Sequence, residues 1–305
     1  MKIAVFGGCN FDITARPRGA ARARTSTASD VRFSAGGVGA NIAANLALLG
    51  CRTTLVTPLG KDPWGAYLKA NLRRRGIAAR TLPSARTGVY VAALKPDGGL
   101  LTGFCDMAAE KVTPGDIDAL RFDFASFDAA VIDANFSAAT VTHLARLCAR
   151  AGLRYALEPV SDGKSIRLSG ALAGCEFIKP NLSEAGLLTG QSRASGPRAK
   201  KCARLLAGRG AENVVVSLGS GGIQVLSRGV EKHFAAPKVR AKNVTGAGDA
   251  LFAAFYLGLL KGFSPRRCAL AGLAAAALTC RSEASVSGAV STAVFKEPQG
   301  GPGNL

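Results

Sequence analysis

The chain has 305 residues, of which 48% are hydrophobic and 19% charged, and its formal net charge is +19. This length allows one large α/β domain or two smaller ones, each with a sizeable hydrophobic core. No apolar run is both long enough and sufficiently free of charge to predict a membrane span, so a bilayer-spanning protein is not expected.

The first residues and the cysteines indicate a cytoplasmic protein. The apolar stretch after Lys2 is about four residues long and ends in two glycines, unlike the longer core of a secretion signal. The eight cysteines include no C-x-x-C pair, and with only two histidines in the chain a zinc centre is not expected. Most of the cysteines lie among apolar residues, which favours reduced, buried thiols.

The basic excess could indicate binding to nucleic acid or attraction of a polyanionic substrate. The only tight basic runs are residues 16–24 and 73–75, and the second fits the last turn of a helix, where cations complement the helix dipole. Aromatic residues make up only 6% of the chain, and no nucleic-acid-binding motif is present. A nucleic-acid partner is therefore not expected, and the sequence alone does not explain the charge.

The first half of the chain mixes strands, helices and a hairpin. Glycine turns, the Asp62-Pro63 helix start and the Asp97-Gly98 hairpin signal delimit these elements. In chain order we expect a strand at 3–6, a polar stretch at 14–35, a helix at 41–49, a strand at 53–57, a helix from Asp62 to Arg75, and a hairpin of strands 87–94 and 100–104.

From about residue 125 strands and helices alternate. Strands are expected at 129–132, 155–157, 177–179 and 214–218 and around Ile223 and Lys232, and helices at 138–150, 183–188, 198–209, 248–260 and 265–280. This alternation predicts an α/β fold with a mostly parallel sheet covered by helices on both faces. We expect one domain over residues 1–296, a small β lid made of segments at about 14–35 and 79–107, and a disordered tail at 297–305.

Several polar residues follow predicted strands, at the edge where open α/β sheets bind ligands. Each of them taken alone fits a turn or a helix cap equally well, but their shared position favours a common site. They are Asp12, Asn135, Glu158, Asn181, Glu184, Gly219 and Gly222.

The stretch NVTGAGDALFAAFYLGLL, residues 243–260, places one carboxylate between a glycine turn and an apolar helix. Asp249 could simply cap the helix. Alternatively, the backbone N–H groups of Gly246, Ala247 and Gly248 could bind an anion at the positive helix terminus. Asp249 would then lie beside that anion, placed to take a proton from an attacking hydroxyl.

Other phosphate-binding and catalytic motifs are absent. The P-loop pattern GxxxxGK[ST] does not occur, and neither the glycines near Gly7 nor residues 36–39 complete a GxGxxG dinucleotide signature. No GxSxG elbow is present, and His143 and His233 fall on a predicted helix and an edge strand. A hydrolase triad is therefore not expected.

Two stretches resemble the two signatures of the ribokinase-like (PfkB) carbohydrate and nucleoside kinases. They are Gly36-Gly-Val-Gly-Ala-Asn41 and Asn243-Val-Thr-Gly-Ala-Gly-Asp249. Lys179-Pro-Asn-Leu-Ser-Glu184 and Ser217-Leu-Gly-Ser-Gly-Gly222 match further marks of that family, and the resemblance covers nearly the whole chain. It implies a three-layer sandwich with a small β lid and ATP-dependent transfer of the γ-phosphoryl group to a sugar hydroxymethyl.

The resemblance also implies roles for individual residues. Asp249 would be the base, and Gly246, Ala247 and Gly248 the anion hole for the transferred phosphoryl group. Glu184, with Asn181, would hold Mg²⁺ largely through water. Asp12 and Asn41, with the Gly36-Gly37 turn, would hold sugar hydroxyls. The ATP-binding residues would be Asn181, Ser217, Gly219, Gly222 and Thr245.

One position departs from the family pattern. Many members have Asp where this chain has Asn243, in a loop that binds a potassium ion in those members. The resemblance therefore leaves a monovalent cation (K⁺) possible but its requirement open.

Within the family the chain looks most like the pseudouridine kinases. The marks are Asn243-Val-Thr, Thr87-Gly-Val-Tyr90 with Asp106-Met107, Glu158-Pro-Val-Ser161 with Lys164, and Glu283-Ala-Ser-Val286. On this resemblance Thr27, Tyr90 and Asp106 of the lid would face the base or ribose. Asn10, Asn135 and Lys164 are further candidates for substrate binding.

Alternatives to a pseudouridine kinase remain open at this stage. The same chemistry could act on ribose, a ketose or an ordinary nucleoside, and a catalytically silent fold could serve as a sugar sensor or basic scaffold. Expected partners are ATP and a small nucleoside or sugar, without membrane or nucleic acid, and the lid could form a homodimer surface.

Overall fold

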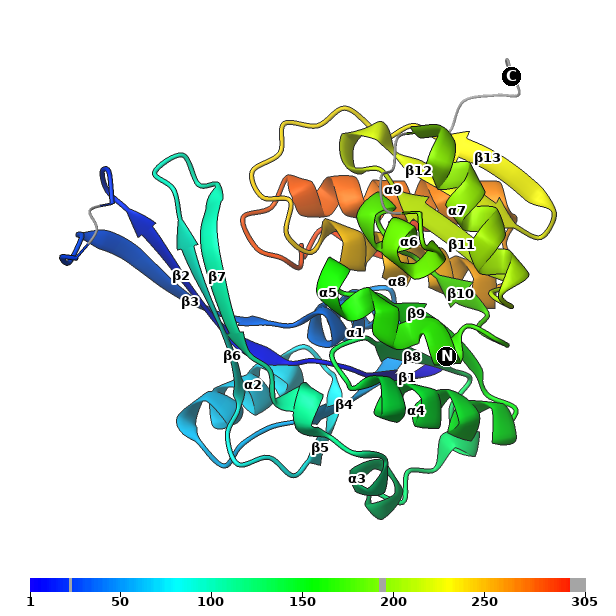
Figure 1. The fold of residues 1–305 in the computed structure, drawn as a ribbon, viewed down its shortest axis with the longest axis horizontal. Coiled ribbons are helices and arrows are strands. Elements are labelled where there is room, and N and C mark those ends of the chain that lie inside the picture. The colour runs from blue at the N-terminus through cyan, green and yellow to red at the C-terminus, as the bar shows by residue number, and fades with distance from the viewer. Residues whose placement is uncertain (22–23, 192–195, 297–305) are drawn as a thin grey trace.

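The computed structural model describes residues 1–21, 24–191 and 196–296, so the expected tail at 297–305 lies outside the described residues. Figure 1 shows a layered α/β body from which a second, smaller sheet extends to one side.

The larger sheet has nine strands in the order β13-β12-β11-β10-β9-β8-β1-β4-β5. The seven neighbouring strands β11, β10, β9, β8, β1, β4 and β5 pair in parallel, and β12 and β13 add an antiparallel edge next to β11. The strands are β1 (Lys2–Phe6), β4 (Arg52–Pro58), β5 (Ala78–Leu82), β8 (Ala129–Asp133), β9 (Arg154–Glu158), β10 (Phe177–Ile178), β11 (Asn213–Ser217), β12 (Ile223–Ser227) and β13 (Val230–Phe234).

Apolar residues on both faces of these strands explain the three layers. Ile3 and Val5 of β1 pack into one core cluster, whereas Ala4 and Phe6 of the same strand pack into the other. Helices α1 (Val38–Leu48), α2 (Pro63–Arg74), α8 (Ala247–Leu260) and α9 (Pro265–Cys280) cover the first cluster, and α4 (Ala138–Arg150), α6 (Leu182–Thr189) and α7 (Gly196–Gly208) cover the second. A sheet buried on both faces needs strands that are almost wholly apolar, as these are.

The helix starts expected from the sequence are confirmed where a cap was visible. Asp62 caps α2, accepting a hydrogen bond from the Gly65 N–H, with Pro63 at the first helical position. Short elements that the sequence did not reveal also occur: α3 (Pro114–Ala119), α5 (Asp162–Ser165), and 3₁₀ turns at Ala108–Lys111, Phe124–Ser126, Ile166–Ala171, Gly219–Gly221 and Thr292–Phe295.

The small sheet has the strand order β3-β2-β6-β7. Its strands are β2 (Asn10–Pro17), β3 (Ser29–Gly36), β6 (Gly88–Leu94) and β7 (Leu100–Asp106). Two expected lid boundaries were wrong. The lid begins at Asn10 rather than at residue 14, and β5, inside the expected segment 79–107, pairs with β4 in the large sheet because it follows α2 as the second half of a βαβ unit.

The two faces of the small sheet differ in chemistry. Ile13 is in register with Phe33 and with Val91, and Val91 with Phe104, so these four side chains share one face. Near its root this face packs on α2, where the Phe11 ring lies 4.1 Å from the ring of Trp64. The opposite face carries Asp12 and its register partner Tyr90. The apolar face therefore points away from the side that bears the candidate sugar-binding residues.

Six of the eight cysteines are buried and Cys105 is exposed, in agreement with the expected buried thiols. In the described part of the chain, no helix combines the length and apolar character needed to cross a bilayer.

Candidate functional site

A glycine turn leads into α8, and Asp249 lies in the first turn of that helix. Gly246 is the N-cap and has φ of 80°, a left-handed conformation that glycine adopts without steric cost. A β-carbon at Gly246 would collide with the backbone carbonyl of Ser285, so segment 283–286 packs directly against the turn. The N–H groups of Gly248 and Asp249 have no carbonyl partner inside the helix, which leaves them available to an anion.

Asn41 of α1 brings the two signature stretches into contact. Its side-chain Nδ2 donates a hydrogen bond of 2.9 Å to Asp249 Oδ2, across 208 residues of sequence. The Asn41 Oδ1 accepts a weaker bond of 3.5 Å from the Ser285 hydroxyl. Asp249 is only 8% exposed, so this amide holds a carboxylate that has little water around it.

Four further charged side chains are buried near Asp249: Asp133, Glu158, Lys179 and Glu184. They come from neighbouring parts of the sheet edge, because Asp133 ends β8, Glu158 ends β9 and Lys179 directly follows β10. Lys179 Nζ lies 3.4 Å from Glu158 Oε2. One ammonium thus stands among four carboxylates in a largely dry region.

Burial dominates the ionisation of these groups. It raises the pKa of Asp249 to about 6, although the Asn41 hydrogen bond and the Lys179 ammonium both favour the ionised form. Burial also raises the pKa values of Glu158, Asp133 and Glu184. Burial alone would lower the pKa of Lys179, but Glu158, Glu184 and Asp249 more than offset this and raise it, which keeps the ammonium protonated.

The candidate sugar-binding residues gather where β2 and β3 join α1. The Asp12 carboxylate lies over Gly36, since a β-carbon there would collide with it. Gly37 has φ of 98°, and a β-carbon there would lie 2.5 Å from the Gly8 carbonyl, so only glycine fits this turn. Burial raises the pKa of Asp12 to about 7. The Asn10 side chain points toward Gly88 of β6, and Tyr90 stands opposite Asp12.

Asn135 and Lys164 belong to a network next to this group. Asp133 accepts bonds from the Gly8 N–H at 2.9 Å and from Asn135 Nδ2 at 3.0 Å. The free oxygen of the Asn135 amide accepts from Lys164 Nζ at 2.9 Å. The network therefore holds Gly8, in the turn after β1, and this turn lies against Gly37.

The structure places the candidate nucleotide-binding residues at the ends of β10 and β11. Asn181 caps α6 and forms a reciprocal capping box with Glu184, with bonds of 2.9 and 2.8 Å. Ser217 forms an isolated bridge with Asn181, and Gly219 and Gly222 make the turn that follows, both with positive φ. Gly222 contacts Phe234 and Ala236, so the segment that begins at 235 starts against this turn and ends at Gly246.

That connecting segment is strongly basic. An open groove runs along it, and Thr245, at its end, is exposed. The groove is lined by Lys238, Val239, Arg240, Ala241, Lys242 and Arg281. Four of these six residues carry positive charge, so the groove attracts an extended anion toward the α8 turn.

Glu184 fits the expected role in holding Mg²⁺. Its Oε2 is engaged by the Asn181 N–H, which fixes the side chain and leaves Oε1 for a water ligand. Lys179 is ion-paired with Glu158, and the four carboxylates of this region carry more negative charge than the one ammonium neutralises. A hard divalent cation with oxygen ligands suits this donor set. Within the described residues no group of three or more His, Cys, Asp or Glu side chains is placed to hold a metal ion by itself.

The side chain of Asn243 is hydrogen-bonded at both ends of its amide. Asn243 Nδ2 donates to the Glu283 carbonyl at 2.9 Å, and its Oδ1 accepts from the Thr245 N–H at 2.9 Å. The second bond fixes the amide orientation, because a flipped amide would place its NH₂ against another donor. The Glu283 carbonyl therefore accepts a hydrogen bond from the Asn243 side chain.

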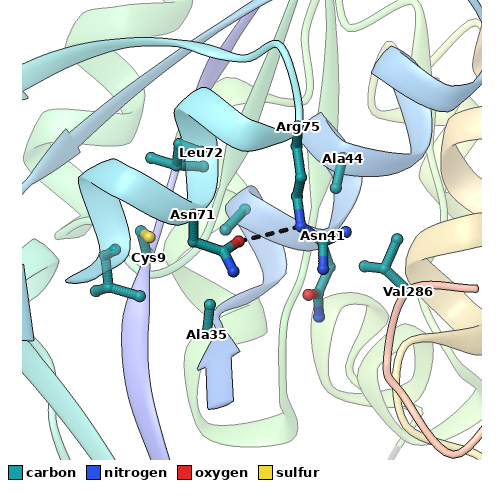
Figure 2. Close-up of a pocket in the computed structure, with 10 residues that line it drawn as sticks. Cys9, Ala35, Asn41, Ala44, Asn71, Leu72, Arg75 and Val286 are labelled. Atoms are coloured by element: carbon teal, nitrogen blue, oxygen red, sulfur yellow. Dashed lines mark hydrogen bonds between the residues drawn. The ribbon is translucent and has the colours of Figure 1, made fainter.

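A small cavity of about 20 Å³ lies behind Asn41, between α1 and α2 (Figure 2). It has room for about one water molecule. Asn71 of α2 and Arg75, the residue that follows α2, line it and are joined by a hydrogen bond of 3.0 Å. The cavity is a void behind the site rather than a substrate pocket, because it cannot hold a sugar.

Two expected lid residues are placed apart from this group. Asp106 is in register with Val89, so it falls on the apolar face, and it pairs with Arg86 at 2.8 Å and Lys111 at 3.3 Å. Thr27 precedes β3, and its carbonyl accepts from the Ser29 hydroxyl. We therefore do not retain Asp106 as a substrate-binding residue.

Sequence reasoning gave no role to Asp133 or Lys179. A signal was present, because each directly ends or follows an apolar strand, at the same edge as Asn135 and Glu158. A charged residue at the end of a wholly buried strand has to meet a partner or a ligand.

Comparison with known proteins identifies the family of the chain. The family model described as pfkB family carbohydrate kinase matches residues 1–292. The chain is 28% identical to the pseudouridine kinase of Escherichia coli over 256 residues, covering 82% of this chain and 81% of that protein. It is 27% identical to the deoxyribokinase of Salmonella typhi, covering 84% of each.

Solved structures show the same fold. A carbohydrate kinase from Agrobacterium tumefaciens superposes with a TM-score of 0.84 at 28% identity, covering 96% of this chain and 95% of that one. Ribokinase from Giardia lamblia gives a TM-score of 0.84 at 19% identity, covering 96% and 97%.

The family match and the kinases among its relatives define a phosphotransferase with an alcohol group as acceptor. The chain belongs to the PfkB family of carbohydrate kinases. It is a sugar or nucleoside kinase of that family.

Proposed function

We propose that the protein transfers the γ-phosphoryl group of ATP to the ribose 5′-hydroxyl of pseudouridine, giving pseudouridine 5′-phosphate. The observation that carries the transfer is the contact of Asn41 with Asp249 at the start of α8, which joins the candidate sugar side to the candidate anion hole. The similarity to the pseudouridine kinase of E. coli supports the choice of substrate.

In the proposed reaction the substrate hydroxyl oxygen forms a bond to the γ-phosphorus. The bond from that phosphorus to the oxygen bridging to the β-phosphate breaks, and ADP leaves with the electron pair. The hydroxyl proton passes to Asp249, which is mostly ionised at pH 7 because its pKa is about 6. The amides around Gly248 and the positive end of α8 stabilise the negative charge on the phosphoryl oxygens.

The nucleoside and ATP bind on opposite sides of Asp249, along the edge of the large sheet. Asp12, Asn10 and Asn41 hold the sugar hydroxyls, and Asn135, held by Lys164, completes that side. The small sheet covers the nucleoside with the face that carries Tyr90. On the other side the basic groove along 238–242 and the Ser217–Gly222 turn receive the nucleotide. A ribokinase of Arabidopsis thaliana with the same fold was solved with ribose and ATP.

Glu184 would hold Mg²⁺ through water, and when bound the ion neutralises charge on the β- and γ-phosphates. In the neighbouring loop, the Asn243 amide donates a hydrogen bond to the Glu283 carbonyl, so these two residues are joined without a bound cation. We propose that the enzyme needs no potassium ion for this reason.

The protein acts in the cytoplasm in this proposal. It pairs through the lid, because the exposed Phe33 and Phe104 lie on the apolar face of the small sheet, away from the site.

A substrate panel tests the proposal. ADP release is measured with pseudouridine, uridine, ribose, deoxyribose and fructose at equal concentration. Pseudouridine should give the highest kcat/KM. A higher value for free ribose, deoxyribose or fructose would reject the substrate but keep the phosphoryl transfer, and no turnover with any alcohol would reject both.

A further inference from the structure

Lys179 is a buried cation, and its contacts with the described residues do not use all of its hydrogen-bond donors. It is 4% exposed, and an ammonium group has three donors. Among the described residues its ion-pair partner is Glu158, at 3.4 Å, which can receive one of these donors. A buried ammonium with donors left over is costly unless a ligand completes its contacts.

The position of the ammonium indicates what that ligand is. A β-carbon built at Gly248 would lie 3.4 Å from Lys179 Nζ, so the ammonium lies beside the first turn of α8. The free amides of Gly248 and Asp249 belong to the same turn. Two kinds of positive group, a full charge and a helix terminus, therefore converge on one small volume next to the Asp249 carboxylate.

The ion pair with Glu158 explains why the Lys179 ammonium is buried at this position, but it uses only part of the hydrogen-bonding capacity of that group. Strand β9 lies between β8 and β10, and its last residue, Glu158, stands beside the residue that follows β10. Glu158 Oε1 is 3.5 Å from the Val160 N–H, a weak contact that still helps fix the carboxylate from its own loop. The carboxylate thus holds one N–H group of Lys179, and the remaining N–H groups of the ammonium are free to point toward the first turn of α8.

We propose that Lys179 is a catalytic residue that donates hydrogen bonds to an oxygen of the transferred phosphoryl group. The inference rests on the proposed phosphoryl transfer but not on the identity of the acceptor alcohol. In the transfer the hydroxyl proton still passes to Asp249, and Lys179 stays protonated throughout. Its contribution is charge stabilisation that grows as negative charge spreads over the phosphoryl oxygens.

The competing explanation is that Lys179 only balances the charge of Glu158. A single Lys179→Met variant does not separate the two, because it leaves Glu158 buried without its partner and destabilises the fold. Replacing both members removes the pair as a unit and leaves no isolated charge in the interior, which is what makes a single replacement strongly destabilising. The decisive variant is therefore Lys179→Met combined with Glu158→Gln.

The experiment measures kcat and KM for the alcohol that the wild-type enzyme phosphorylates fastest. We expect the double variant to unfold within a few degrees of the wild type. Its kcat should fall about 10²–10³-fold, the size of losing one strong donor to a developing anion. The KM for the alcohol should change little, because Lys179 is on the phosphoryl side. Glu158→Gln alone should lose far less than the double variant. Lys201→Met, on the exposed face of α7, should leave kcat unchanged.

A second readout does not depend on turnover. Aluminium fluoride with ADP and the alcohol mimics a transferring phosphoryl group, and its added thermal stabilisation should be present in the wild type and lost in the double variant. If the folded double variant keeps kcat within about threefold, or Glu158→Gln is as slow as the double variant, the role of Lys179 is refuted. Failure of the wild type to phosphorylate any alcohol would instead refute the proposed function.

Discussion

The side chains of Asn41 and Asp249 meet in a 2.9 Å hydrogen bond, although 208 residues separate them. Each residue closes one of the two glycine-rich stretches, so the bond joins the start of α1 to the start of α8. It also favours the ionised form of a carboxylate whose pKa burial raises to about 6. The contact thus sets both the position and the basicity of the proposed base.

Replacing Asp249 with Asn tests the base directly. The amide keeps the shape of the side chain but cannot accept the hydroxyl proton, so we expect kcat to fall by about 10² or more. Thermal stabilisation by the nucleoside should persist, because the sugar contacts lie elsewhere. Turnover within threefold of the wild type would remove Asp249 from the mechanism.

The pH profile should report the same group. An acid acts as a base only after it has lost its proton, so kcat/KM should fall tenfold per unit below about pH 6, the pKa of Asp249. Asn41→Ala removes the hydrogen bond that lowers this pKa, so the fall should begin at higher pH. In Asp12→Asn the limb near pH 6 should remain, since that variant removes only the group of pKa about 7. An acid limb that is identical in wild type and Asn41→Ala would contradict the assignment.

Gly246 should tolerate no side chain. Alanine there has to adopt φ of 80° and also collides with the Ser285 carbonyl, so α8 has to move away from segment 283–286. The matched control is Gly190→Ala, with φ of 74° and no atom within 4 Å, which should cost only the conformational term of about 1–2 kcal/mol. Urea unfolding should show a larger loss for Gly246→Ala, together with a fall in kcat that the control lacks. Equal losses would mean that the turn does not depend on the contact with Ser285.

Asn243→Asp should create a cation requirement that the wild type lacks. The carboxylate would face the Glu283 carbonyl without a donor, and two oxygens in contact need a cation between them. Wild-type turnover should be equal in potassium chloride and choline chloride at the same ionic strength. The variant should be slow in choline and recover in potassium. A wild-type enzyme that potassium activates several-fold would overturn this interpretation of Asn243.

Phe33→Glu tests the lid as a dimer surface. Phe33 and Phe104 are 59% and 65% exposed on one face, an unusual amount of apolar surface for a monomer. Sedimentation should give a dimer for the wild type and a monomer for the variant. Arg32→Ala, one residue away and on the other face of β3, should remain dimeric. A wild type that sediments as a monomer would contradict the prediction.

Local chemistry let the sequence predict most elements correctly. The cap of α2, the glycine stops of α2 and α4, the apolar strands β1, β8 and β11, and the α8 turn all depend on neighbours within a few residues. The strand β5 was missed because its residues, Ala78–Leu82, are mostly exposed and carry no alternating pattern. The four-residue helix α5 was missed because a single turn leaves no periodicity to detect.

The sequence by itself determined the layered α/β class and the glycine-flanked acid at residue 249, since both follow from periodicity and backbone freedom over short spans. Only the tertiary structure decided which charges meet. It put Asp106 on the apolar face through a one-residue register, and it placed Lys179 between Glu158 and Gly248 through the order of β9, β10 and α8. Such contacts depend on strand order and burial, and neither is encoded in any short stretch of chain.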